Sequence, residues 1–394
     1  MEQQGSNSAQ VLRTPEFVFV QNAVRAHYSR AEVQPQFVPP AFEQREFGFG
    51  FEGKIDFRHK AFRSQRELID FFVRDAPLYA SYSTGHYTLP AGRPMPRKGF
   101  MGADLVFDLD RIYSDEHPDT HNPIACARCL SRAKEDAMRF YEEFLLGDFG
   151  FSGAEVEINY SGSKGFHFHV RSDSVQQLSS DARKQLCDYA AGFEISGESM
   201  LREQAEGRRK VIEGPSPSSR GWPARVYKNL LNALSSASNG EFATLGFTPK
   251  FIKRVGASPD YVKKYSSEGN WTFASDEIVP LRAMIGGFVS KARVELDKPV
   301  SFDLARLIRI PETIHGDTGF AARKIAPNEF SDFEPLEDAV VLSAEPVAVV
   351  PNFTGEVMLK GGTFGLGEGK RREVPTYAAV LLLRKGKASL AQKE

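Results

Sequence analysis

Hydrophobic and polar residues alternate along several short stretches in the first half of the chain. The clearest stretch, residues 103–110, reads Ala-Asp-Leu-Val-Phe-Asp-Leu-Asp, and its period of two predicts a strand. Successive side chains of a strand point to opposite faces, so Asp108 and Asp110 would share the face opposite to the two leucines. Similar alternation at 155–160 and 165–171, separated by Ser-Gly-Ser-Lys, predicts a β-hairpin with a four-residue loop.

Helical spacing with recognisable start signals occurs elsewhere in the chain. A helix is predicted at 14–29, where Thr-Pro suits the first positions, and another at 64–74, where Ser-x-x-Glu resembles a capping box. Further helices are predicted at 131–146 and 377–384. From about 179 to 287 the pattern is mainly helical, which indicates an inserted helical region.

The composition is that of a globular protein with a sizeable core, because hydrophobic residues make up 41% of the 394 residues. The net charge of −1 carries no global nucleic-acid signature, so any such contact would come from local patches or from a partner. Three cysteines cannot form a disulfide framework and indicate a reducing compartment. No run of about 18 apolar residues and no leader pattern is present, so we expect a soluble, cytoplasmic protein that does not bind membranes.

Two of the carboxylates of the 103–110 strand point to metal chemistry. Asp108 and Asp110 would lie close together, and two neighbouring carboxylates stay ionised at low cost only when a cation lies between them. Carboxylate oxygens suit a hard divalent ion such as Mg²⁺, which takes further ligands from water and substrate phosphates. The alternative is a strand whose outer face is simply exposed to solvent.

The predicted hairpin loop offers donors for phosphate oxygens. Ser161 supplies a hydroxyl and Lys164 a compact positive charge. Gly162 in the loop and Gly165 directly after it let the backbone approach a ligand closely. His167 and His169 would lie on the polar face of the second strand. The alternative is a polar hairpin with surface histidines.

A third segment, residues 293–319, carries further candidates. Residues 293–296 are predicted to form a strand, so that Asp297 at its end could complete a metal site. Residues 303–309 are predicted to form a short helix, with Arg306 and Arg309 on one face. Arg309 and His315 could then reach a triphosphate after a turn at Pro311, with Asp303 as the helix cap. The alternative is a solvated helix face followed by a turn histidine.

The three segments, in this order, closely resemble the catalytic (small) subunit of the archaeal–eukaryotic DNA primase family, in its archaeal form. The resemblance covers about residues 15–325. The matching patterns are Phe-Asp108-Leu-Asp110, Ser161-Gly-x-x-Gly165-x-His167, and Leu-Asp297 followed by Arg-Leu-Ile-Arg309-x-Pro-x-x-x-His315-Gly-x-Thr-Gly319.

The resemblance implies a role for each matching residue. Asp108, Asp110 and Asp297 would hold two catalytic ions, Mg²⁺ or Mn²⁺, in a nucleotidyl transfer that releases pyrophosphate. The remaining residues match family positions that hold the phosphates and sugar of the incoming nucleotide: Ser161, Lys164, His167, Arg309 and His315.

A cysteine–histidine cluster follows the 103–110 strand directly. His117, His121, Cys126 and Cys129 have the composition of a structural, tetrahedral zinc site. The family also carries a zinc knuckle at this place. The alternative is an incidental cysteine pair, and Cys187 is expected to be a small core residue.

The family's fold is a primase-type α/β (α+β) catalytic core with a mixed sheet, a zinc knuckle and an inserted helical region. We therefore expect four parts: a flexible N-terminus at 1–14, the first part of the catalytic core at 15–178 with the zinc knuckle at 113–130, the mainly helical insertion at 179–288, and the second part of the core with a C-terminal tail at 289–394.

The expected function is the synthesis of short RNA primers, and possibly DNA primers, de novo on single-stranded DNA from nucleoside triphosphates. Family members work with a primase large subunit that carries an iron–sulfur cluster, so the heterodimer and the template strand are the expected partners. Two alternatives stay open: a primase-polymerase for repair or end joining, and a non-catalytic, zinc-bearing scaffold that binds single-stranded DNA.

Local basic stretches could track the template phosphates. Each is also compatible with a solvated surface, and the sequence does not distinguish among them. The stretches are Arg208-Arg209-Lys210, Lys250 with Lys253-Arg254, and Lys263-Lys264 with Tyr261 and Tyr265.

Overall fold

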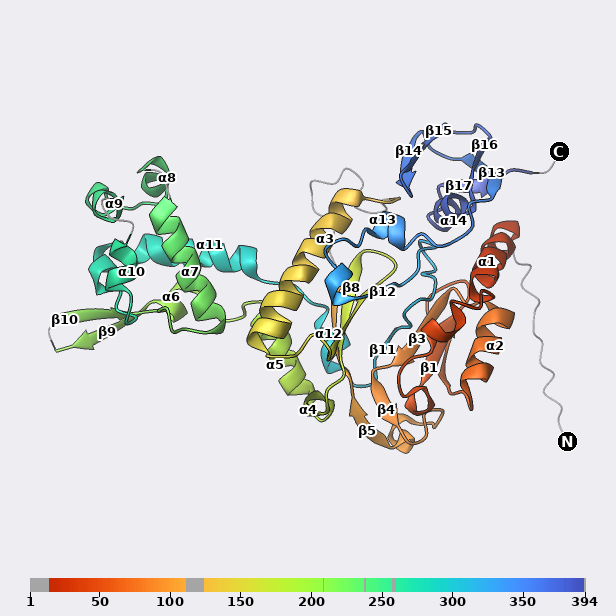
Figure 1. Cartoon of the computed structure of the whole chain (residues 1–394), viewed down its shortest axis with the longest axis horizontal. Helices are drawn as coiled ribbons and strands as arrows, with labels where there is room; N and C mark the ends of the chain where they lie inside the picture. Colours follow the sequence, from red (N-terminus) through yellow and green to blue (C-terminus); the bar gives the residue numbers. More distant parts are fainter. Residues whose placement is uncertain (1–13, 111–123, 208, 237–238, 257–259, 393–394) are drawn as a thin grey trace. The chain divides into compact units, whose positions relative to one another are not determined.

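The computed structural model describes residues 14–110, 124–207, 209–236, 239–256 and 260–392 (Figure 1). The chain divides into two compact units. Unit 1 consists of residues 1–138, 153–183 and 297–394, and unit 2 of residues 139–152 and 184–296. The domain boundaries predicted from the sequence stay predictions, and each unit is described by itself.

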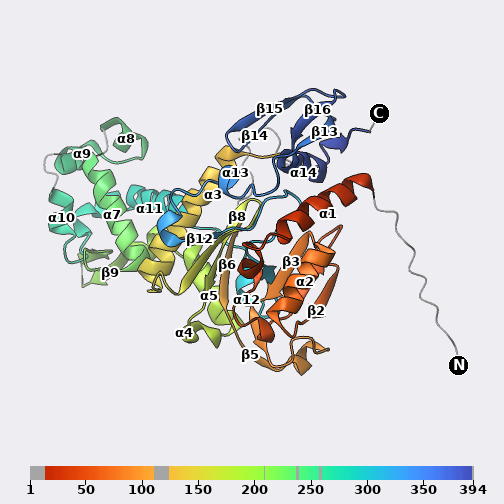
Figure 2. The same cartoon turned by 45° about the vertical axis from the view of Figure 1, so that its right-hand side comes forward.

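The first sheet of unit 1 is antiparallel, with strand order β11-β3-β1-β2. Its strands are β1 (Phe47–Gly50), β2 (Phe57–Lys60), β3 (Tyr79–Ser83) and β11 (Leu307–Arg309). Helices α1 (Pro15–Tyr28) and α2 (Gln65–Asp75) lie side by side next to it (Figures 1 and 2). The ring of Phe71 in α2 lies 4.4 Å from that of Phe49 in the sheet, and Phe72 contacts Tyr28 of α1 at 5.0 Å. Aromatic packing therefore joins both helices to this sheet.

The second sheet of unit 1 has the order β12-β7-β8-β6 and is also antiparallel. Its strands are β6 (Leu105–Asp110), β7 (Val156–Tyr160), β8 (Gly165–Val170) and β12 (Lys324–Ile325). The β6–β8 register pairs Asp108 with His167 and Asp110 with Gly165. The predicted carboxylate strand and the predicted hairpin are thus confirmed, and they lie directly next to each other.

The remaining elements of unit 1 surround these sheets or form its C-terminal part. The helices are η1 (Gln34–Phe37), η2 (Phe42–Gln44), η3 (Met95–Lys98), α3 (Ala127–Arg139), α4 (Asp173–Gln176), α12 (Lys298–Phe302), η6 (Pro327–Glu329), α13 (Pro335–Asp338) and α14 (Thr376–Arg384). The strands are β4 (Gly85–Tyr87), β5 (Phe100–Ala103), β13 (Pro346–Pro351), β14 (Gly355–Leu359), β15 (Gly362–Leu366), β16 (Arg372–Pro375) and β17 (Ala388–Leu390).

The predicted helix starts are confirmed by their capping bonds. The Thr14 hydroxyl accepts from the amide of Phe17 at 3.2 Å, with proline at the next position. The Ser64 hydroxyl accepts from the amide of Glu67 at 3.2 Å. The Glu67 carboxylate accepts from the amide of Arg63 at 2.7 Å, one residue earlier than a capping box requires.

Two predictions near Asp297 were wrong. Residues 293–296 are not a strand, because they follow α11 as an irregular segment with no neighbouring strand in the described chain. Residues 303–309 are not a helix, because Leu307–Arg309 pairs with β3 at the edge of the first sheet. Buried Ile308 and Ile310 fit that edge, so tertiary pairing overrides the local charge spacing.

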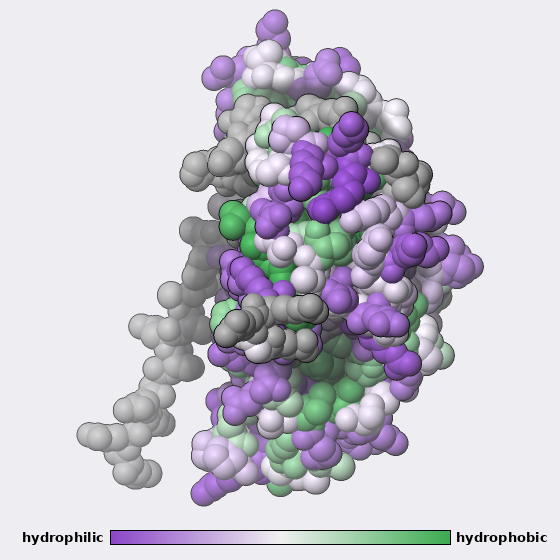
Figure 3. Space-filling model, turned by 90° about the vertical axis from the view of Figure 1, so that its left-hand side faces the viewer, coloured by the Kyte–Doolittle hydropathy of each residue, from purple (hydrophilic) through white to green (hydrophobic). Residues whose placement is uncertain are grey.

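Unit 2 is mainly helical and also contains one hairpin that the sequence pattern did not predict. Its helices are α5 (Ser180–Ala190, beginning in unit 1), α6 (Gly197–Met200), α7 (Gly221–Ser236), α8 (Asn239–Thr244), α9 (Pro249–Gly256), α10 (Tyr261–Tyr265), η5 (Thr272–Glu277), α11 (Ile278–Ala292) and the π-helix η4 (Phe140–Asp148). The hairpin pairs β9 (Arg202–Glu206) with β10 (Arg209–Glu213). Figure 3 shows unit 2 from the side of α8–α10, where hydrophilic side chains cover much of the surface.

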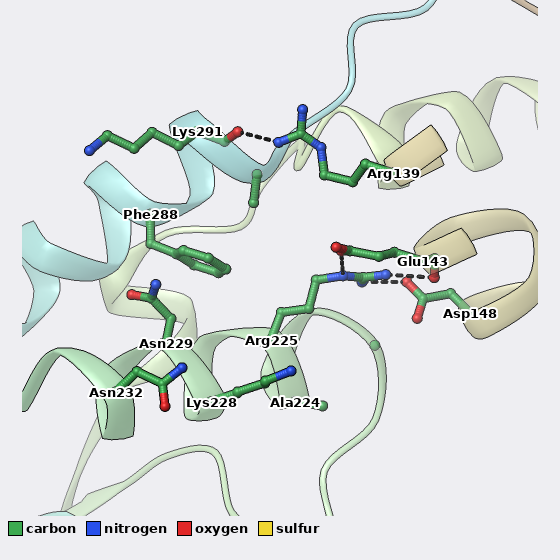
Figure 4. A pocket seen from close by; sticks show the side chains of 12 residues that line it. Arg139, Glu143, Asp148, Ala224, Arg225, Lys228, Asn229, Asn232, Phe288 and Lys291 are labelled. Carbon is green, nitrogen blue, oxygen red and sulfur yellow. Dashed lines mark hydrogen bonds and ion pairs between the residues drawn. The ribbon is translucent and has the colours of Figure 1, made fainter. Parts of the chain in front are cut away.

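A cavity of about 590 Å³ lies within unit 2, lined by α7, α11 and η4 (Figure 4). The Arg225 guanidinium pairs with Glu143 at 2.7 Å and with Asp148 at 2.5 Å, and it lies 4.3 Å from the ring centre of Phe144. These contacts join η4 to α7. None of the residues predicted to form a site from the sequence lines this cavity.

The fold prediction is confirmed at the level of class, because helices and antiparallel sheets combine in an α+β protein. Among the helices that the structure describes, none is both long and apolar enough to cross a bilayer.

Candidate catalytic site

A second cavity, of about 490 Å³, lies in unit 1 between the two sheets and α12. Eight residues predicted from three distant segments line it together: Asp108, Asp110, Ser161, Lys164, His167, Asp297, Arg309 and His315. The fold therefore brings the predicted carboxylates and the predicted phosphate-binding residues to one place. Their individual roles stay predictions.

Strand β6 carries two of the three carboxylates, and the third comes from the turn before α12. The Asp297 amide donates to the Asp108 carbonyl at 2.8 Å. This backbone bond brings the Asp297 side chain to the end of β6, although Asp297 precedes a helix rather than ending a strand. Arg306 also lines the cavity, 3.9 Å from the Asp297 carboxylate.

Burial and mutual repulsion dominate the electrostatics of these carboxylates. Desolvation, then the charges of Asp110 and Asp297, raise the pKa of Asp108 well above its usual value. Desolvation also raises the pKa of Asp110, while Lys164, 3.5 Å away, opposes the shift. Asp108 Oδ1 is buried without a hydrogen-bond partner among the described residues, and His167 Nε2 lies 3.5 Å from it.

This donor set fits a hard divalent cation. The unsatisfied oxygen of Asp108 and the repulsion among three carboxylates are both relieved by a positive charge between them. Within the described residues, no group of three or more His, Cys, Asp or Glu side chains forms a ready metal site.

The hairpin loop between β7 and β8 is held in shape by its own hydroxyl. The Ser161 Oγ accepts from the amides of Gly165 at 3.2 Å and Ser163 at 3.3 Å. Gly162 has φ of +81°, and Thr318 donates to its carbonyl at 2.6 Å. The loop thus packs against the turn that carries His315, which places two predicted phosphate-binding segments next to each other.

Three of the predicted nucleotide-binding side chains are largely enclosed. Desolvation lowers the pKa of His167 and of His315 well below the usual value, so both imidazoles are neutral near pH 7. Desolvation also lowers the pKa of Arg309, which stays charged. Its buried Nη1 has no hydrogen-bond partner among the described residues, so this guanidinium can still bind an anion.

Comparison with known proteins identifies the family. The family model described as DNA primase small subunit matches residues 107–327. The chain belongs to the DNA primase small subunit family. DNA primase small subunit PriS of Methanocella arvoryzae is 32% identical over 94% of this chain and 97% of that protein. The PriS protein of Methanothrix thermoacetophila is 32% identical over 93% of this chain and 96% of that protein. The PriS protein of Methanosarcina barkeri is 31% identical over 95% of this chain and 97% of that protein.

Family membership confirms the resemblance inferred from the motifs. The chain is accordingly a catalytic primase subunit, a nucleotidyltransferase that synthesises primers.

Sequence reasoning missed several residues of this primase site. The Tyr79 hydroxyl donates to Asp317, and both residues line the cavity. Arg384, at the end of α14, donates to the Tyr79 hydroxyl at 3.2 Å and to the Gly316 carbonyl at 2.5 Å. The Tyr79 ring also contacts His315, with 6.4 Å between ring centres. The sequence signal for these contacts is Gly316, directly after His315. A glycine there indicates that another group packs closely against the backbone, but it does not identify that group.

A buried polar network lies behind the carboxylate strand. Asp104 accepts from Arg45 at 2.6 Å, His86 at 2.9 Å and Arg171 at 3.3 Å. Although burial opposes ionisation, these partners together hold the pKa of Asp104 below its usual value. The network joins β4 and the adjoining ends of β6 and β8 to the first sheet, behind the site.

The predicted zinc knuckle lies partly outside the described residues. Cys126 and Cys129 lie at the start of α3 with their sulfur atoms 3.0 Å apart. His117 and His121 are outside the described residues. The zinc site therefore stays a prediction, whereas Cys187 is buried in the core, as expected.

Proposed function

We propose that this chain synthesises short RNA primers, and DNA primers where deoxynucleotides are supplied, de novo on single-stranded DNA. The reaction transfers a nucleotidyl group from a nucleoside triphosphate to a 3′-hydroxyl and releases pyrophosphate. One observation carries the proposal. Three carboxylates and five candidate phosphate-binding side chains, from segments distant in the sequence, line a single cavity.

Asp108, Asp110 and Asp297 would hold two Mg²⁺ or Mn²⁺ ions. When bound, the ions lower the pKa of the attacking hydroxyl and neutralise charge on the leaving pyrophosphate. The unsatisfied Asp108 oxygen supports this assignment. Asp297 is the most exposed to solvent of the three carboxylates and is well placed to adjust around an ion.

The other cavity residues would orient the incoming triphosphate. Lys164 and Arg309 supply positive charges, and Arg309 Nη1 is free to donate to a phosphate oxygen. His167 and His315 are neutral, so each donates one hydrogen bond without adding charge. The Ser161 hydroxyl already accepts from two loop amides, so it would mainly hold the loop in shape.

The further parts of the proposal concern partners and zinc. A primase large subunit bearing an iron–sulfur cluster and a single-stranded DNA template would be the partners, because a small subunit implies a large one. The zinc ligands would be Cys126 and Cys129 together with His117 and His121. Residues 15–178 and 289–394 would form the catalytic core around the insertion at 179–288.

The test is primer synthesis on single-stranded DNA without a supplied primer. We expect Asp108→Ala and Asp297→Ala to abolish synthesis while binding to single-stranded DNA persists. Asp303→Ala is the matched control, because the Asp303 carboxylate accepts from the amide of Ala305 within a turn and does not line the cavity. Full synthesis by Asp108→Ala would contradict the proposal and favour the non-catalytic scaffold.

A further inference from the structure

Helices α9 and α10 carry a concentrated positive charge in a chain that is almost neutral. Residues 249–267 contain Lys250, Lys253, Arg254, Lys263 and Lys264 against one acidic residue, Asp260, whereas the whole chain has a net charge of −1. Both helices pack on α7 within unit 2. Such a local excess attracts polyanions even when the overall charge does not.

The four lysines of this segment are available to a ligand. Lys250, Lys253, Lys263 and Lys264 are exposed, and none makes an ion pair with a described residue. The basic run at 208–210 differs, because Lys210 pairs with Glu203 at 2.6 Å. The structure thus distinguishes between basic stretches that look equivalent in the sequence.

Aromatic rings lie among these lysines. The rings of Tyr261 and Tyr265 lie 4.7 Å apart, and each contacts Phe273, at 5.6 and 5.9 Å. Tyr265 is 47% exposed, with Lys264 Nζ 5.7 Å from its ring centre. A fixed, half-exposed ring beside ammonium groups can stack with one base while the lysines contact the neighbouring phosphates.

Arg254 holds this arrangement in place. Its guanidinium lies 5.3 Å from the ring centre of Phe251 and 5.7 Å from that of Tyr261, and it donates to the Phe273 carbonyl at 2.9 Å. The residue therefore joins α9, α10 and η5. Because the aromatic side chains are already ordered, a ligand that binds there need not order them.

We propose that Lys250, Lys253, Lys263, Lys264 and Tyr265, the α9–α10 face, bind single-stranded nucleic acid and hold the template strand. The template role rests on the proposed function. A partner protein fits this surface less well, because stable protein interfaces have a contiguous apolar centre. Around these helices the exposed large apolar side chains are Tyr265 and Leu245, among the residues that the structure describes.

The test is fluorescence anisotropy of a labelled oligo(dT) with the full chain at several salt concentrations. Each lysine–phosphate contact on a single strand contributes about 0.7 to the slope of the logarithm of the binding constant against the logarithm of salt concentration. The double variant Lys263→Ala/Lys264→Ala should therefore lower the magnitude of this slope by about 1.4. At 0.1 M salt it should bind roughly 20-fold more weakly than the wild type. Tyr265→Ala should weaken binding roughly 5- to 150-fold by loss of stacking. Tyr265→Phe, which keeps the ring, should bind like the wild type.

The matched control replaces Lys228 and Lys291 with alanine, an equal change of charge at exposed positions that line the cavity of unit 2. It should leave binding within about twofold of the wild type. The proposal is overturned if the Lys263/Lys264 variant binds oligo(dT) as the control does. It is also overturned if these variants lose affinity only for the large subunit. At saturating template concentration, the lysine and tyrosine variants should synthesise primers at the wild-type rate. If the wild-type chain itself synthesised no primers, that result would refute the proposed function but not the binding surface.

Discussion

The contact between Gly316 and Tyr79 allows a sharp test of how the nucleotide site is held. A Cβ atom on residue 316 would lie 2.5 Å from Cζ of Tyr79 and 2.6 and 2.9 Å from two further ring carbons. The ring cannot easily retreat, because its hydroxyl is bound by Asp317 and Arg384 and its strand is paired on both sides. Gly316 does not have a positive φ, so alanine is strained there only by this contact.

The expected cost of Gly316→Ala follows from these distances. Forcing an extra methyl group into a packed site costs about 1–3 kcal/mol of unfolding free energy. Alanine also lowers the conformational entropy of the unfolded chain, which stabilises the folded state by about 0.4–1 kcal/mol. The net decrease in the free energy of unfolding is therefore roughly 1–2 kcal/mol. The ring and the turn must also separate, which displaces His315. We therefore expect the Michaelis constant for the nucleotide to rise about tenfold, as roughly 1.4 kcal/mol of lost binding would produce.

A double-mutant cycle is the decisive assay for this contact. Unfolding by urea and nucleotide titrations are measured for Gly316→Ala, for Tyr79→Ala and for the double variant. The cost of Gly316→Ala should vanish in the Tyr79→Ala background. Gly365→Ala is the control, since no atom lies within 4 Å of its Cβ position. An equal cost of Gly316→Ala in both backgrounds would refute the packing argument.

Three further predictions concern stability and metal content. Burial lowers the pKa of His27 to about 4 and of His169 to about 3, so both are neutral when folded. In the unfolded chain the same two histidines take up protons below about pH 6.5, so protonation favours unfolding. The free energy of unfolding should therefore be lower at pH 5 than at pH 8 by about 2 kcal/mol per histidine. Equal free energies of unfolding at the two pH values in urea titrations would contradict this. Asp104→Asn should lower the free energy of unfolding by about 3–5 kcal/mol, because the fully buried Arg45 loses its counter-charge. An unchanged melting temperature of this variant would refute the prediction. Cys126→Ser should remove zinc measured by atomic emission, whereas Cys187→Ser should retain it; equal zinc in both would exclude Cys126 as a ligand.

The sequence predicted those parts of the site that depend on neighbouring residues. The period of two along β6 and β8 places Asp108 and His167 on one face, and the register of the hairpin follows from its loop. The motif with Asp297 and Arg309 indicated the correct residues but the wrong secondary structure. Arg309 is held in a strand by β3, and Asp297 is bonded to Asp108 of β6; both partners are more than 180 residues away in the chain.

Long-range contacts were beyond any local pattern. Arg384 reaches Tyr79 and Gly316 from the last helix, and nothing in its own neighbourhood indicates a partner. The β9–β10 hairpin was missed because Arg-Glu-Gln-Ala-Glu has no apolar alternation. The exposed state of the lysines in α9 and α10 likewise depends on which acidic residues the fold brings near.

The central claim is that three carboxylates from distant segments bind the catalytic ions together. Crystals of the full chain soaked with Mn²⁺ and a non-hydrolysable nucleoside triphosphate would test it by anomalous scattering. We predict manganese between Asp108, Asp110 and Asp297, with oxygen ligands from all three at about 2.0–2.2 Å and from the triphosphate. Manganese bound elsewhere, or bound here without Asp297, would contradict the account.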